Sequence, residues 1–118
     1  MKVLVVDDDF SMLTSMIRLL EVLEHKVYDA RNGVEAKELI EQWGKFDAII
    51  TDSRMPKMGG VSLLEWFRTE FEPVPKTRLI IISDDVSSPK IEALCLRYPD
   101  IQKLQKPFGE EILIKFLG

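Results

Sequence analysis

Side chains that can bind or transfer phosphate stand directly after four apolar stretches of the chain. These end residues are, in chain order, Asp7 and Asp8, Asp52, Ser83 and Lys106. A buried strand that ends in an acid and a loop is typical of open α/β sheets, whose ligands bind outside the carboxyl ends of the strands. We therefore expect these side chains to converge on one phosphate and one divalent cation.

Three of the end residues are carboxylates, and their mutual repulsion has a chemical consequence. If Asp7, Asp8 and Asp52 lie together without a cation, at least one of them resists ionisation. Mg²⁺ (or Mn²⁺) removes the conflict, because it takes oxygen ligands, keeps several waters and accepts one or two carboxylates beside a phosphate. Asp52 then has a second oxygen free to attack phosphorus, so the sequence predicts a nucleophile that forms an acyl phosphate.

The other two end residues suit the charge of a phosphoryl group. Lys106 supplies a positive point charge, and the Ser83 hydroxyl can donate to a phosphate oxygen. Each residue also has a simpler interpretation: Asp9 as a helix cap, Lys106 as a surface lysine, Ser83 as a strand-end serine. The functional prediction depends on their occurring together, each at the end of a different strand.

The elements that would position these residues alternate along the chain. Continuous apolar runs predict buried strands, and apolar residues at helical spacing predict amphipathic helices. The predicted strands are residues 3–6, 27–30, 48–51, 79–82 and 101–105, and the predicted helices are residues 10–24, 34–43, 60–71, 89–98 and 112–117. This alternation predicts an α/β fold with a parallel sheet and right-handed crossovers, in one domain that spans residues 1–118.

Composition restricts the class of protein. The 118 residues are 46% hydrophobic and 31% charged, which is typical of a soluble globular domain. A net charge of −4 argues against direct binding of nucleic acid. No apolar run approaches the roughly 18 residues of a membrane span, and no signal pattern begins the chain, so we expect a cytoplasmic protein with no membrane contact. The single cysteine, Cys95, has the spacing of a core residue.

The motifs together resemble the receiver domain of two-component response regulators along nearly the whole chain. The matching segments are VLVVDDD at 3–9, DAIITDSRMPKMGG at 47–60, LIIIS at 79–83 and KPF at 106–108. The resemblance implies a flavodoxin-like, doubly wound fold: a five-stranded parallel sheet in the order 2-1-3-4-5 with five helices, in three αβα layers.

The resemblance also implies roles for the residues. Asp52 would accept a phosphoryl group from a histidine kinase or a histidine phosphotransfer protein. The Mg²⁺ ligands would be Asp8 directly, Asp7 largely through water, Asp52, and the backbone carbonyl of Arg54. Ser83 would be the switch hydroxyl. Such a domain is not an enzyme beyond self-catalysed phosphorylation and dephosphorylation.

The resemblance also implies a role for Lys106 and for the surface through which phosphorylation acts. Lys106 would pair with the phosphoryl group, and phosphorylation would act through an attached effector domain or a homodimer. Receivers usually carry an aromatic residue three positions before this lysine, but here the position is Lys103. We therefore expect a different output, by loop order, by dimerisation or by passing the phosphate on.

A second departure lies beside the phosphoacceptor. The residue after the switch hydroxyl is usually small, but here it is Asp84, followed by Asp85. Asp84 should repel an incoming phosphoryl group unless Arg54 or Lys57 pairs with one of these acids. We expect these side chains to change the rates of phosphorylation or hydrolysis.

Two other functions are compatible with parts of the pattern. The first is a receiver-like docking module that is never phosphorylated. The second is an Asp-based phosphohydrolase of the haloacid dehalogenase type, in which Asp7 would be the nucleophile. In that type the catalytic lysine precedes the last acid pair, whereas Lys106 follows Asp84 and Asp85, and 118 residues leave no room for a cap or a full sheet.

Overall fold

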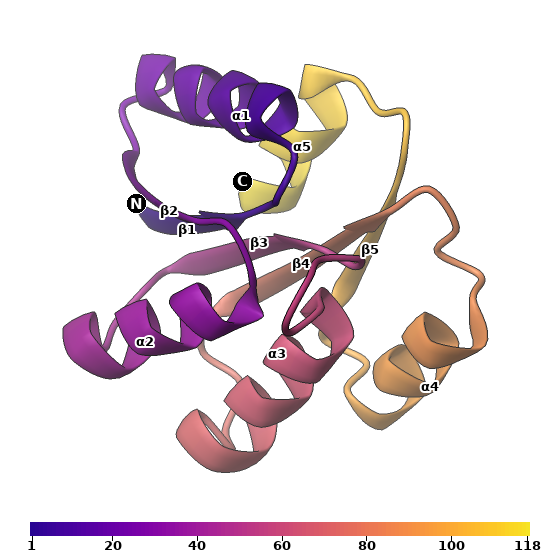
Figure 1. Cartoon of the computed structure of the whole chain (residues 1–118). Coiled ribbons are helices and arrows are strands. Elements are labelled where there is room, and N and C mark those ends of the chain that lie inside the picture. Colours follow the sequence, from indigo (N-terminus) through magenta and orange to yellow (C-terminus); the bar gives the residue numbers. More distant parts are fainter.

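Five parallel strands form the central layer of the protein in a computed structural model that describes residues 1–118 (Figure 1). The strands are β1 (Lys2–Val6), β2 (Lys26–Ala30), β3 (Ala48–Asp52), β4 (Arg78–Ser83) and β5 (Gln102–Gln105). Their order in the sheet is β2-β1-β3-β4-β5, so the predicted order 2-1-3-4-5 is confirmed. The polar strand β5 lies at an edge of the sheet, as its sequence suggests.

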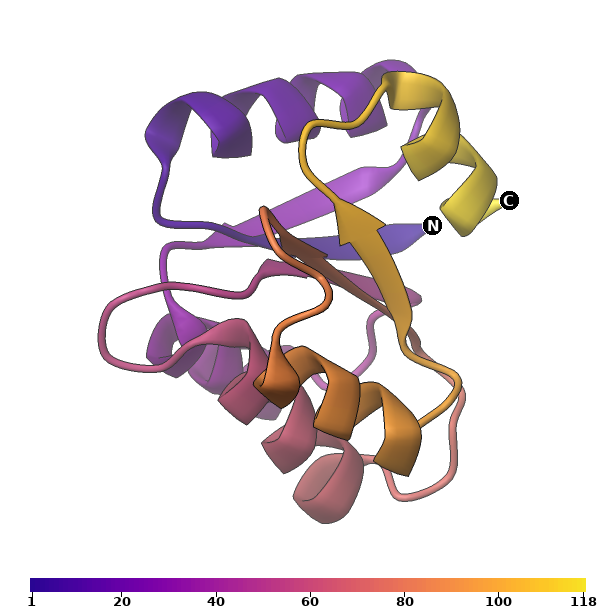
Figure 2. The same ribbon diagram turned by 90° about the vertical axis from the view of Figure 1, so that its right-hand side faces the viewer.

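Helices cover both faces of this sheet. They are α1 (Phe10–Val22), α2 (Gly33–Trp43), α3 (Gly60–Trp66), which continues as the π-helical turn η1 (Phe67–Phe71), α4 (Pro89–Arg97) and α5 (Glu110–Leu117). Figures 1 and 2 show α1 and α5 on one face and α2, α3 and α4 on the other. The three-layer αβα, flavodoxin-like architecture is therefore confirmed. None of the helices is long and apolar enough to cross a membrane.

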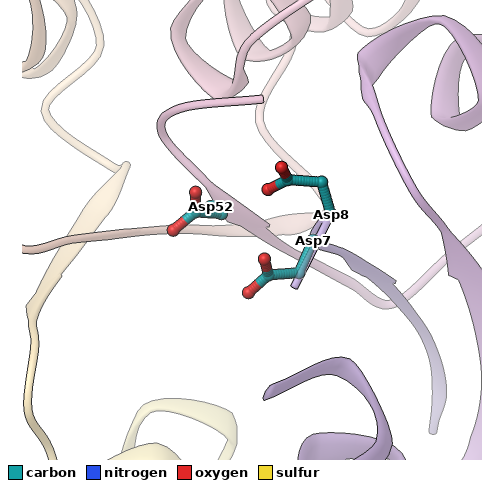
Figure 3. A group of neighbouring side chains, drawn as sticks. All are labelled: Asp7, Asp8 and Asp52. Carbon is teal, nitrogen blue, oxygen red and sulfur yellow. The ribbon is translucent and has the colours of Figure 1, made fainter. Parts of the chain in front are cut away.

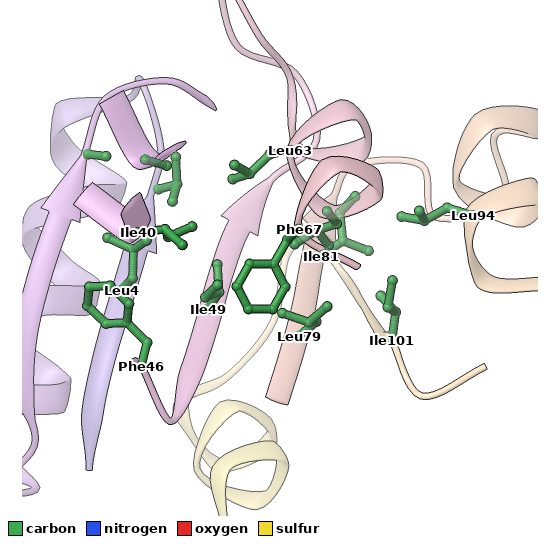
Figure 4. Close-up of a cluster of buried hydrophobic side chains, with 14 of the residues drawn as sticks. Leu4, Ile40, Phe46, Ile49, Leu63, Phe67, Leu79, Ile81, Leu94 and Ile101 are labelled. Atoms are coloured by element: carbon green, nitrogen blue, oxygen red, sulfur yellow. The ribbon is translucent and has the colours of Figure 1, made fainter. Parts of the chain in front are cut away.

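The strands read as continuous apolar runs because each face of the sheet has its own core. Leu4 and Val6 join a cluster of 15 buried residues under α2, α3 and α4, part of which Figure 4 draws. Val3 and Val5 point the other way, into a cluster of 12 buried residues under α1 and α5. Alternate side chains of a strand point to opposite faces, so a sheet covered on both sides needs apolar residues at every position.

Several element ends differ from the predicted ones by one or two residues. Helix α1 ends at Val22, because Glu24 adopts a left-handed backbone conformation with φ 67°. Asp9 caps its N-terminus, where Oδ1 accepts hydrogen bonds from the N–H groups of Ser11 and Met12. Ser88 precedes α4 as expected, but its side chain makes no capping hydrogen bond.

The predicted helix 60–71 is divided, and its second part holds a buried ionic network. Arg68, in η1, is 3% exposed and donates to the carboxylates of Glu72 and Asp100. Glu72 in turn accepts hydrogen bonds from Thr77, whose hydroxyl also contacts the Phe46 carbonyl oxygen at 3.1 Å. The network joins the end of α3 to the segments that lead into β4 and β5. Helical periodicity alone did not predict it.

Candidate functional site

Three carboxylates meet at the carboxyl edge of the sheet (Figure 3). Asp7 and Asp8 follow β1, and Asp52 is the last residue of β3. The two strands are neighbours with Val6 opposite Thr51, so their ends coincide. One carboxylate oxygen of each acid lies within 4.8 Å of the others. Asp7 and Asp52 are buried, whereas Asp8 is exposed.

The carboxylate of Asp7 is buried, and only one of its oxygens is hydrogen-bonded. Its Oδ1 accepts a hydrogen bond from the Asp9 N–H at 2.9 Å, but its buried Oδ2 has no partner. Burial raises the pKa of Asp7; the Asp9 hydrogen bond and the Lys106 charge oppose this, and the charges of Asp52 and Asp8 add to it. A buried oxygen without a donor, among like charges, fits a hard divalent cation.

Asp52 is held from two sides. Lys106 Nζ donates to Asp52 Oδ1 at 2.7 Å, and the Arg54 backbone N–H donates to Oδ2 at 3.2 Å. Burial lowers the pKa of Lys106, but the hydrogen bond to Asp52 and the charges of Asp52, Asp7 and Asp84 outweigh it, and the net pKa is raised. The lysine therefore stays positive beside the acid at neutral pH.

Ser83 lies beside this pair at the end of β4. It is buried, and its Oγ accepts a hydrogen bond from the Asp85 N–H at 3.0 Å. Its carbonyl oxygen accepts from the Lys106 N–H at 2.8 Å, which ties the two strand ends together. Ser83 also lines a groove of about 750 Å³ between α3 and α4, with Ser53 and Arg54. The groove thus reaches Ser83, although the residue itself is buried.

Two glycines let the loop after β3 fold back against the site. A Cβ at Gly60 would lie 2.2 Å from the Asp52 carbonyl oxygen, and one at Gly59 would lie 2.7 Å from that of Ser53. The Gly60 N–H donates to the Ser53 carbonyl oxygen at 3.1 Å. Glycine is required wherever a backbone approaches another so closely. The pattern of residue types in the sequence did not predict this contact.

Asp84 and Lys103, the two departures from the family pattern described above, each have an ion-pair partner. Arg54 lies 3.9 Å from Asp84, with both side chains mostly exposed, so one of the pairings considered above is present. Lys103 lies 3.7 Å from Glu92 of α4. The Gln105 side chain hydrogen-bonds to the loop between β4 and α4, a contact the sequence did not predict. No pattern in the sequence indicates this contact, because an exposed glutamine can hydrogen-bond to many different groups.

The profile of the response regulator receiver domain family matches residues 3–117. Similar curated proteins include the response regulator MprA of Mycobacterium sp. (strain KMS), 32% identical over 113 residues, and that of Mycobacterium leprae, 31% identical over 114 residues. These matches cover 96% and 97% of this chain, but 47% and 48% of the relatives. The chain thus spans about half the length of the curated relatives it matches.

Solved structures agree with this match. Chemotaxis protein CheY4 of Vibrio cholerae superposes with a TM-score of 0.84 at 30% identity, covering 98% of this chain and 94% of that one. The receiver domain of sensor histidine kinase PA1611 from Pseudomonas aeruginosa has a TM-score of 0.83 at 25% identity, covering 98% and 93% of the two chains. That structure holds a magnesium ion in its active-site cleft. By sequence and by fold, this chain belongs to the response regulator receiver domain family of two-component signalling.

Proposed function

We propose that the chain is a phosphoacceptor module in which Asp52 accepts a phosphoryl group from a phosphohistidine. The donor would be a histidine kinase or a histidine phosphotransfer protein. The observation that carries the proposal is the 2.7 Å contact of Lys106 with an Asp52 carboxylate that also lies within 4.8 Å of Asp7 and Asp8. A nucleophilic carboxylate, a fixed positive charge and a cation site are the parts that phosphoryl transfer needs.

The transfer begins with a carboxylate oxygen of Asp52 facing the donor's phosphorus. A P–O bond forms to Asp52 as the P–N bond to the imidazole breaks, and the imidazole nitrogen keeps the electron pair and takes up a proton from solvent. Lys106 and the Ser83 hydroxyl, which joins from the end of β4, would stabilise the charge on the phosphoryl oxygens. Hydrolysis of the acyl phosphate, by attack of water on phosphorus, restores Asp52.

The residues that would hold Mg²⁺ (or Mn²⁺) are Asp7, Asp8, Asp52 and the Arg54 carbonyl oxygen. The unpartnered Asp7 Oδ2 supports this set, since it is an oxygen ligand that lacks a donor in the protein. When bound, the cation neutralises part of the negative charge that carboxylates and phosphate share. The Arg54 N–H donates to Asp52, which keeps the backbone of this residue beside the cluster and supports its carbonyl oxygen as a ligand.

Intact mass measurement after incubation with Mg²⁺ and a small acyl-phosphate donor tests the proposal. We expect the wild type to gain one phosphoryl group and Asp52→Ala to gain none. Asp29→Ala, which removes an exposed carboxylate from β2, is the matched control and should gain the group. A wild type that gains no mass would favour a docking module, and continuous release of inorganic phosphate in the Asp52→Ala variant would favour a phosphohydrolase.

A further inference from the structure

The Gln105 side chain joins the end of β5 to the loop between β4 and α4. Its Nε2 donates to the Asp84 carbonyl oxygen at 2.6 Å and to the Lys106 carbonyl oxygen at 2.9 Å, and its Oε1 accepts from the Val86 N–H at 3.2 Å. A primary amide has two donor hydrogens and one acceptor oxygen, so each polar atom of this exposed side chain has a protein partner. Ordering a glutamine in this way costs rotamer entropy, which the hydrogen bonds must offset.

The backbone beneath this side chain carries two residues of the site. Ser83 pairs with Gln105 in the register of β4 and β5, and the Lys106 N–H donates to the Ser83 carbonyl oxygen at 2.8 Å. The Ser83 hydroxyl accepts from the Asp85 N–H in the same loop. The loop is therefore attached to the site by one bond from Ser83 and two from Gln105.

Helix α4, which follows the loop, has few other contacts that fix its position. Of the nine residues of α4, only Ile91 and Leu94 are buried. The groove of about 750 Å³ beside it leaves space toward α3. The ion pair from Lys103 to Glu92 joins two side chains that are more than one-third exposed, and such pairs contribute little. The position of α4 thus depends on the loop that precedes it, which Figure 2 shows beside the end of β5.

We propose that Gln105 is a positioning residue that holds the β4–α4 loop and the Lys106 backbone in a fixed position relative to each other. It would thereby transmit a change at Ser83 to α4 in place of an aromatic switch residue. The second part of this inference rests on the proposed function, because it takes phosphorylation of Asp52 as the event that moves the hydroxyl. The first part concerns the unphosphorylated protein and stands without it.

The chemistry of the transmission is an exchange of hydrogen bonds. When the Ser83 hydroxyl turns to a phosphoryl oxygen on Asp52, it leaves the Asp85 N–H. The two bonds from Gln105 then remain, so the segment from Asp84 to Val86 moves with β5 as one piece and carries the start of α4. Without the amide, the segment would be released and α4 would not follow.

Amide hydrogen exchange of the unphosphorylated protein tests the first part. In Gln105→Ala we expect the Val86 amide to exchange about fivefold faster, as for the loss of one ordinary hydrogen bond. Gln102→Ala, on the same strand and without a side-chain hydrogen bond, is the control and should leave Val86 unchanged. Gln105→Glu keeps an acceptor for Val86 but has no donor for the two carbonyl groups, so Val86 should stay protected. Equal exchange at Val86 in wild type and Gln105→Ala would overturn the proposal.

Backbone amide chemical shifts before and after phosphorylation test the second part. We expect the change at residues 89–97 to fall by half or more in Gln105→Ala, and by less in Gln105→Glu, which keeps the Val86 bond, although mass measurement shows the same phosphoryl adduct in each. A full response of α4 in these variants would overturn the transmission. A wild type that forms no adduct would instead contradict the proposed function, and the exchange result would then decide the role of Gln105 by itself.

Discussion

Asp7, Asp8 and Asp52 share one corner of the sheet with Lys106, and their charges do not balance. The lysine hydrogen-bonds to Asp52, but one buried oxygen of Asp7 has no partner. Burial of a charge without compensation destabilises the folded state. At the scale of the residue, the protein therefore gives up stability at the position where a cation would bind.

Replacing Asp7 by asparagine should stabilise the protein in the absence of divalent cations. Burial raises the pKa of Asp7, so its contribution to stability is fully present below the unfolded pKa of about 3.9 and is lost as the pH rises through the folded pKa. We expect Asp7→Asn to raise the free energy of unfolding at pH 7 by about 1 kcal/mol. The gain should disappear as the pH approaches 4. Urea unfolding at both pH values measures this, and an equal gain at both would contradict the electrostatic explanation.

The exposed pair of Arg54 and Asp84 should control access to Asp52. Removing the negative charge at Asp84 leaves Arg54 free to attract an anionic donor, so we expect Asp84→Asn to be phosphorylated about threefold faster by a small acyl phosphate. Arg54→Gln should be slower than the wild type. Asp85→Asn is the control, because that side chain accepts from the Ser87 N–H and has no ion pair. The difference should shrink as salt is added; a salt-independent difference would indicate a steric cause.

At the scale of the element, the loop from Asp52 to α3 has its shape because of close backbone contacts. The strand ends at Asp52, and the chain returns so that Gly60 passes beside the carbonyl group of that same residue. Strand β3 and helix α3 thus meet without space for a side chain. The position of the nucleophile depends on glycine as well as on the strand.

Gly60→Ala should destabilise the protein by about 1–3 kcal/mol, because its Cβ would lie 2.2 Å from the Asp52 carbonyl oxygen and the backbone must shift. Gly109→Ala is the matched control: Gly109 also lies at the start of a helix, as the N-cap of α5, but its Cβ would have no atom within 4 Å. Urea unfolding of both variants gives the comparison. Similar stabilities of the two variants would mean that the loop after Asp52 can relax without cost.

Arg68 of η1 is buried and connects two segments that are distant in the chain. Arg68→Met should lower the free energy of unfolding by about 3 kcal/mol, since it leaves the partly buried carboxylates of Glu72 and Asp100 without their cation. Arg97→Met, at the exposed end of α4, should change it little. Thermal unfolding checks the order of the variants. Retained phosphorylation in Arg68→Met would separate this structural role from the site.

At the scale of the whole molecule, the cation and the fold are thermodynamically linked. A ligand that binds only the folded state stabilises it in proportion to the logarithm of its concentration. Asp7 and Asp8 come from the end of β1 and Asp52 from the end of β3, so their arrangement exists only when the sheet is formed. Binding of Mg²⁺ should therefore appear as resistance to unfolding.

Mg²⁺ at about 100 times its dissociation constant should add about 2.7 kcal/mol to the free energy of unfolding. The melting temperature of the wild type should rise with the Mg²⁺ concentration, and that of Asp52→Ala should rise much less. Asp29→Ala, which removes a carboxylate that is not part of the acid cluster, serves as the control and should respond like the wild type. If all three proteins respond alike, the cation acts by general screening and not at the acid cluster.

The sequence by itself determined the layers, the strand order and the convergence of Asp7, Asp8, Asp52, Ser83 and Lys106, given the family resemblance. Apolar periodicity is local, and the carboxyl ends of parallel strands meet at one edge whatever the side-chain details. Other features depended on contacts between segments far apart in the chain: the unpartnered oxygen of Asp7, the contact at Gly60, the Arg68 network and the bonds of Gln105. Only the tertiary structure decided these, because folding brings the partners of an exposed glutamine or a helical arginine from distant parts of the chain, and the sequence around the residue does not identify them.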